Sequence, residues 1–161
     1  MATAIAGLNL GYSFKSSVSL GGKVATQASG RWIAGGSEFT ISTNGTSITY
    51  RSLPPNSWVL QAGQGWVEVD GTIPGGSPLD ALATPVQVSL VVGNGPGLDF
   101  RAMYPAARLG LAGDGTVPVD IVLASDGSIT ATYTDPAGSA NSTTILRPDP
   151  AQLPIAAPSP S

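Results

Sequence analysis

The chain has 161 residues, of which 42% are hydrophobic and only 11% charged, and its net charge is −3. It contains no His and no Cys, which are the side chains that most proton-transfer, nucleophilic and zinc sites use. Its 7 basic residues stand singly along the sequence, whereas a nucleic-acid-binding surface needs them clustered. We therefore expect one domain that takes no cofactor or metal and does not bind nucleic acid.

Alternation of apolar and polar residues predicts β-strands from the start of the chain. The first strand covers residues 9–20, in which Leu10, Tyr12 and Phe14 share one parity. A glycine pair then predicts a turn, and a second strand follows over 24–33. Both segments have the pattern of strands that are buried on one face.

Asn44-Gly45 gives the strongest local signal, because this dipeptide favours the type I′ turn of a two-residue hairpin. It lies between two alternating segments, 39–43 and 46–50. The predicted register pairs Ile41 with Ile48, Phe39 with Tyr50 and Glu38 with Arg51. The hairpin would then have one apolar and one polar face.

The middle of the chain predicts two short strands, over 57–60 and 65–70. Ser77 followed by Pro78 predicts a capped helix over 78–83. Residues 86–92 are apolar on both faces, which fits either a central strand or a continuation of the helix; we favour the strand.

The last third predicts a strand over 98–104, a short helical turn over 106–111, a hairpin of 117–124 with 129–134, and a final strand over 143–147. Two loop lengths fit the hairpin. A two-residue turn pairs Leu123 with Thr130, and a three-residue loop pairs Leu123 with Ile129, Ile121 with Ala131 and Val119 with Tyr133. We favour the longer loop, because it gathers apolar residues on one face.

These elements predict a mainly β (α+β) fold: a curved antiparallel sheet or half-barrel with one or two short helices on its concave side. Residues 1–147 would form a single antiparallel β domain. Residues 148–161, rich in Pro, Ala and Ser, would form a disordered tail.

Catalytic chemistry finds little support in the sequence. A glycosidase would need two carboxylates at a set separation; Glu68, Asp70, Asp99 and Asp120 are the candidates, but solvated strand-face charges explain them better. We predict that the protein is not an enzyme and has no catalytic residues. An acid/base enzyme using Glu68 or Asp120 remains the least favoured alternative.

Several segments carry a resemblance to a known family: Gly36-Ser37-Glu38-Phe39-Thr40-Ile41, Ile48-Thr49-Tyr50, Leu53-Pro54-Pro55-Asn56-Ser57-Trp58, Gly65-Trp66, 117–123 and 126–129. Together they resemble the mycobacterial envelope lipoprotein family typified by LppX and LprG. The resemblance implies a half-barrel sheet, an acyl-chain cavity and lipid transport through the envelope. The chain departs from the family in having no lipobox Cys, and the family's opening amphipathic helix is either absent or present only as residues 1–10.

On this basis the leading hypothesis is a non-enzymatic carrier of acyl lipids or glycolipids, including lipoglycans, in an actinobacterial cell envelope. Its partners would include envelope membrane proteins, and its location would be extracytoplasmic, with a leader or anchor outside these residues. The predicted ligand-binding residues are Phe39, Ile41, Ile48, Tyr50, Ile121 and Leu123. The alternative is a structural or assembly β-domain that uses its aromatic face for protein–protein contact. The sequence does not predict an oligomeric state.

Overall fold

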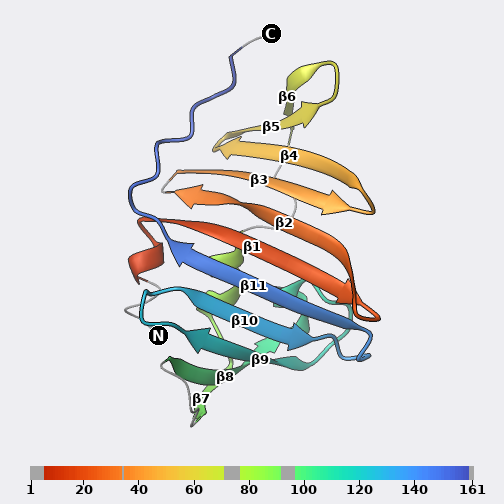
Figure 1. The fold of residues 1–161 in the computed structure, drawn as a ribbon, viewed down its shortest axis with the longest axis vertical. Coiled ribbons are helices and arrows are strands. Elements are labelled where there is room, and N and C mark those ends of the chain that lie inside the picture. Colours follow the sequence, from red (N-terminus) through yellow and green to blue (C-terminus); the bar gives the residue numbers. More distant parts are fainter. Residues whose placement is uncertain (1–5, 34, 71–76, 92–96, 160–161) are drawn as a thin grey trace.

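A single antiparallel sheet dominates the fold, which we describe from a computed structural model covering residues 6–33, 35–70, 77–91 and 97–159. The described residues form 11 strands in the order β6-β5-β4-β3-β2-β1-β11-β10-β9-β8-β7. The sheet does not close, because β6 and β7 lie at opposite edges, and it has a half-barrel-like shape (Figure 1). A mainly β, antiparallel fold is therefore confirmed.

The strands are β1 (Gly11–Leu20), β2 (Lys23–Ile33), β3 (Gly36–Thr43), β4 (Thr46–Leu53), β5 (Asn56–Gln61), β6 (Gly65–Val69), β7 (Gln87–Val91), β8 (Leu98–Pro105), β9 (Thr116–Leu123), β10 (Ile129–Thr134) and β11 (Ala140–Pro148). The helix α2 (Pro78–Ala83) precedes β7, and the 3₁₀ helix η1 (Ala106–Leu109) follows β8. Residues 6–8 are also helical. Figure 1 shows α2 and η1 on the same side of the sheet, behind its central strands.

The hairpin of β3 and β4 forms in the predicted register. Asn44 and Gly45 have φ values of 51° and 82°, the positive values that a type I′ turn requires. Ile41 pairs with Ile48, Phe39 with Tyr50 and Glu38 with Arg51.

The hairpin of β9 and β10 adopts the longer of the two predicted loops. Leu123 pairs with Ile129 and Ile121 with Ala131. The ladder ends at the next pair, Asp120 with Thr132, so it does not reach Val119 and Tyr133. The register that gathers apolar residues on one face is confirmed over its first two apolar pairs.

The C-terminal strand β11 lies in the middle of the sheet, between β1 and β10. Tyr12 of β1 pairs with Pro148, and Leu20 pairs with Ala140. The sheet therefore consists of two groups of consecutive strands, β1–β6 and β7–β10, joined through the last strand of the chain. The strand favoured for residues 86–92 forms as β7, but it lies at an edge of the described sheet and not at its centre.

The two faces of the sheet differ in chemistry. We call the side that carries Tyr12, Phe39, Tyr104, Ile121 and Leu146 the core face, because these side chains are buried. The opposite side, the polar face, carries Lys15, Arg31, Thr40, Arg51 and Thr143. Because side chains alternate along a strand, each strand contributes to both faces.

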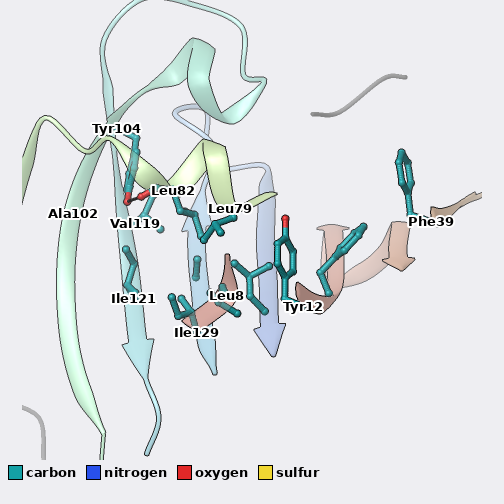
Figure 2. Close-up of a cluster of buried hydrophobic side chains, with 13 residues drawn as sticks. Leu8, Tyr12, Phe39, Leu79, Leu82, Ala102, Tyr104, Val119, Ile121 and Ile129 are labelled. Atoms are coloured by element: carbon teal, nitrogen blue, oxygen red, sulfur yellow. Dashed lines mark hydrogen bonds between the residues drawn. The ribbon is translucent and has the colours of Figure 1, made fainter. Parts of the chain in front are cut away.

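Two buried tyrosine hydroxyls hold α2 against the core face. The hydroxyls of Tyr12 and Ser77 share a hydrogen bond of 2.8 Å, and Ser77 also caps the helix by accepting from the Asp80 N–H. At the other end of the helix, the Tyr104 hydroxyl donates to the Leu82 carbonyl at 2.9 Å. Figure 2 shows this cluster, with Leu79 and Leu82 of α2 among the sheet residues. The predicted Ser77 cap and Pro78 start are confirmed.

The segment 149–159 contacts the polar face, although its composition predicts disorder. Arg31 Nη1 donates to the Leu153 carbonyl and Arg51 Nη1 to the Ala156 carbonyl, both at 3.0 Å. Ile155 is only 6% exposed, and a Cβ added at Gly36 would lie 3.6 Å from the Ile155 Cβ. The difference arises because the segment's backbone carbonyls accept from two strand arginines while one apolar side chain is buried.

The hydroxyl of Tyr104 makes the stability of the fold sensitive to alkaline pH. Burial raises the pKa of Tyr104 from its ordinary value of 10.0 to about 12. The contribution of the neutral phenol is fully present below pH 10 and is lost as the pH rises through 12. We predict that Tyr104→Phe lowers the free energy of unfolding by about 1 to 3 kcal/mol at pH 7 and flattens its decline between about pH 10 and 12.

Urea unfolding at a series of pH values measures both effects. Tyr133→Phe is the control, because its hydroxyl reaches the Leu109 carbonyl at 3.4 Å, a longer and weaker contact. An equal loss of stability in the two variants would contradict the anchoring role of Tyr104.

The C-terminal segment provides a second test with two neighbouring residues. Ile155→Ala should cost about 2 kcal/mol or more, since it removes a buried side chain. Leu153→Ala should be neutral within about 0.5 kcal/mol, because Leu153 is 77% exposed. Urea unfolding of both variants measures the difference, and equal midpoints would show that the segment does not pack on the sheet in solution.

Candidate ligand-binding site

A row of small side chains crosses the centre of the core face. Ala28, Ser16, Thr144 and Ala131 are consecutive cross-strand neighbours on β2, β1, β11 and β10. Directly paired residues on one face lie within about 5.5 Å of each other, so the row extends over four adjacent strands. The surface of the sheet is therefore low along this line.

Large apolar residues stand at both ends of this row. Ile41 and Ile48 continue it beyond Ala28. Ile121 and Phe100 continue it beyond Ala131. We call this row of small residues the trough, and larger apolar side chains stand at both of its ends.

A cavity of about 370 Å³ lies at the Ala131 end of the trough, where α2 and η1 face the sheet. Its volume falls within the range of about 300–1,000 Å³ typical of small-molecule sites. The residues that line it come from α2 and its start (Pro78, Ala81, Leu82), from η1 and its end (Ala107, Arg108, Leu109, Gly110), and from β10 and β11 (Ala131, Tyr133, Thr144). Most of these side chains are apolar, so the cavity suits a hydrocarbon ligand.

The polar groups at this site are few and mostly paired. The hydroxyls of Ser16 and Thr144 share a hydrogen bond of 2.9 Å across the trough floor. The Tyr133 hydroxyl donates to the Leu109 carbonyl. Arg108 lines the cavity but is exposed, so it places a positive charge at the boundary between the cavity and solvent.

The six residues predicted to bind a ligand all lie on the core face, in two groups. Phe39, Ile41, Ile48 and Tyr50 are neighbours on β3 and β4, and the rings of Phe39 and Tyr50 are 5.4 Å apart. Ile121 and Leu123 lie on β9, with β2, β1, β11 and β10 between the two groups. Phe39 nevertheless belongs to the buried cluster, since its ring lies 6.1 Å from that of Phe14 on β1.

None of the six residues is among those that line the cavity. Ile121 comes nearest, as the direct cross-strand partner of Ala131. The lining residues on α2, η1, β10 and β11 were not recognised in the sequence. The available signal was small or polar residues at positions where alternation predicts core, such as Ser16, Ala131 and Thr144, but their alignment depends on the pairing of β1 with β11.

The carboxylates considered for catalysis do not come together. Glu68 lies on edge strand β6 and Asp120 on β9, towards the opposite end of the sheet. Asp120 accepts two hydrogen bonds from Arg101, at 2.7 and 3.1 Å. Within the described ranges, no group of three or more His, Cys, Asp or Glu side chains could hold a metal ion.

Two aspartates have a lowered pKa for reasons of local turn structure. Hydrogen bonds from the Ser128 side chain and backbone lower the pKa of Asp126. The Ala140 N–H is the main cause of the lowered pKa of Asp135. Both carboxylates are fixed at hairpin turns of the sheet, which is the capping role expected of Asp there.

No protein-family model and no curated protein sequence matches this chain. Among the described residues, no helix has the length and apolar character needed to cross a membrane.

Two of the predicted residues, one from each group, differ in burial, which allows their structural roles to be separated. Ile121 is 2% exposed and Ile48 is 40% exposed. We predict that Ile121→Ala lowers the free energy of unfolding by about 2 to 5 kcal/mol, whereas Ile48→Ala lowers it by less than about 1 kcal/mol. Chemical denaturation measures both values. A small effect of Ile121→Ala would show that the Ile121 side chain is not part of the core.

Proposed function

We propose that the protein is a non-enzymatic binding domain for the acyl chain of a lipid or glycolipid. The observation that supports this most directly is the apolar cavity between α2, η1 and the core face, with Ala131 and Thr144 at its floor. The trough of small side chains continues from this cavity towards β2. An unbranched hydrocarbon chain has the shape to fill a narrow cavity and extend along such a trough.

Removal of apolar surface from water would provide the binding free energy. Each methylene buried contributes about 0.8 kcal/mol, so about ten methylenes contribute about 8 kcal/mol. The loss of translational and rotational freedom on association costs about 4 kcal/mol or more. A long acyl chain can therefore bind with useful affinity, whereas a short one cannot.

Arg108 is the residue that would contact the lipid headgroup in this proposal. Its exposed guanidinium adjoins the apolar cavity, so an anionic headgroup would meet a positive charge where the acyl chain leaves the protein. In this arrangement α2 and η1 cover the concave side of the half-barrel. The Ile41, Ile48 and Tyr50 group then offers further apolar surface for a longer chain or a second one.

The resemblance to the LppX/LprG-type lipoproteins supports the same proposal, since that family combines a half-barrel sheet with an acyl-chain cavity. By this argument the protein carries its ligand in an extracytoplasmic compartment of the cell envelope, and exchanges it with envelope membrane proteins. The competing interpretation is a structural β-domain that uses the Phe39 and Tyr50 face for protein contact. That interpretation predicts no bound acyl chain.

A fluorescent fatty acid tests the cavity directly. Ala81 lines it, while Ala83 lies on the same helix with its side chain exposed. We predict that Ala81→Trp weakens binding of cis-parinaric acid at least about tenfold, a loss of about 1.4 kcal/mol, and that Ala83→Trp leaves binding unchanged. Fluorescence titration measures both, with circular dichroism to show that each variant is folded.

Organic extraction and mass spectrometry of the purified protein provide an independent measurement. Acyl lipids recovered in stoichiometric amounts are the expected result. If the protein carries no lipid and does not bind cis-parinaric acid, the proposed function is wrong. Equal binding by the two Trp variants would instead place the acyl chain outside this cavity.

A further inference from the structure

The outermost strand β7 has the composition of a pairing surface. It pairs with β8 on one side, and it is the last strand of the described sheet on the other. Its residues Gln87–Val91 include no charge and no proline, and all of them are exposed. An edge strand of this kind presents unpaired backbone N–H and C=O groups to which another strand can add.

Exposed apolar side chains continue from β7 onto its neighbour. Val88 and Leu90 point to the core face, as partners of Ala102 and Phe100. Leu90 is 63% exposed and Leu98 on β8 is 53% exposed. This edge therefore combines free backbone groups with a contiguous apolar surface, which soluble monomers usually avoid.

The opposite edge of the sheet has a different composition. The edge strand β6 carries the exposed Glu68. A charged side chain on an edge strand disfavours pairing with an apolar strand of another molecule. One edge strand of the described sheet therefore carries a charge, and the other carries none.

We propose that β7 pairs with β7 of a second copy of this chain, in antiparallel orientation, to form a symmetric dimer with one continuous sheet. Partners in a strand pair point to the same face. A two-fold axis at Ser89 satisfies this rule and uses the whole strand. It places Ser89 opposite the second copy's Ser89, Val88 opposite Leu90, and Gln87 opposite Val91.

The chemistry of the strand selects this partner over the other free edge. Pairing of β7 with β6 of another copy would bring the charge of Glu68 into the contact, and would repeat without closure into a filament. Pairing of β7 with itself brings no charge into the contact. It also places the apolar groups of the two copies, Val88 and Leu90, side by side and ends after two chains.

The size of the contact sets the expected affinity. A five-residue strand and its flanking side chains make a small interface, of the class below about 1,200 Å² that includes weak and transient complexes. The dimer should therefore form in the micromolar range and dissociate on dilution. Analytical ultracentrifugation across that range should show a mass that rises from the 16.1 kDa of one chain to twice that value.

Introduction of a charge on the edge strand tests the proposed contact. Leu90→Lys should shift the dissociation constant upward by at least tenfold, because it places two like charges near the two-fold axis. Leu60→Lys is the matched control, since Leu60 is 44% exposed on β5 at the opposite end of the sheet; its association should not change. A wild-type protein that remains monomeric at every concentration would overturn the proposal, as would a Leu90→Lys variant whose dissociation constant is unchanged.

The absence of Cys from the chain allows a sharper test of register. Ser89→Cys should form a disulfide-linked dimer under mild oxidation, because directly paired Cα atoms lie about 4.5–5.5 Å apart, within disulfide reach. Gln87→Cys should not, since its partner is Val91 and the two new thiols would be several residues apart. Equal cross-linking of both variants, or of neither, would show that β7 does not pair in this register. These results are independent of whether the protein binds a lipid.

Discussion

The hydrogen bonds of two buried tyrosines hold the arrangement on which the core face depends. A single open sheet has no second sheet to cover its apolar side, so a six-residue helix must remain in place over it. So short a helix has little stability of its own. Tyr12 holds its start through Ser77, and Tyr104 holds its end through the Leu82 carbonyl. Without these contacts α2 would lose its position, and with it the cavity between the helices and the sheet.

Contacts between neighbours in the sequence were predicted well, because the information for them is local. Asn44-Gly45 specifies a turn, and the alternation around it specifies which face is apolar. The capped helix after Ser77 follows from the same kind of reasoning. The position of β11 between β1 and β10 could not be predicted in this way, because no pattern within a strand records its partner. For the same reason residues 86–92 were compatible with a central strand, although β7 lies at an edge.

The site shows the same division between local and distant information. Large apolar residues such as Phe39 and Ile121 are conspicuous in the sequence, but they fill or border the core. The cavity depends on small residues, Ala131 and Thr144 among them, that become neighbours only when distant strands pair. The placement of the segment after residue 148 could not be predicted for a related reason. Its composition favours disorder, but Arg31 and Arg51 on distant strands donate hydrogen bonds to its carbonyls.

The central position of β11 has a consequence for synthesis of the protein. Because β11, which joins β1 to β10, is synthesised after both of them, neither group of strands can complete its pairing until β11 has been made. Until then β1 and β10 each present an open edge of backbone groups, which other nascent chains could occupy. Joining of the two groups into one sheet is therefore a late step. Loss of β11 would leave two separate half-sheets instead of a slightly smaller one.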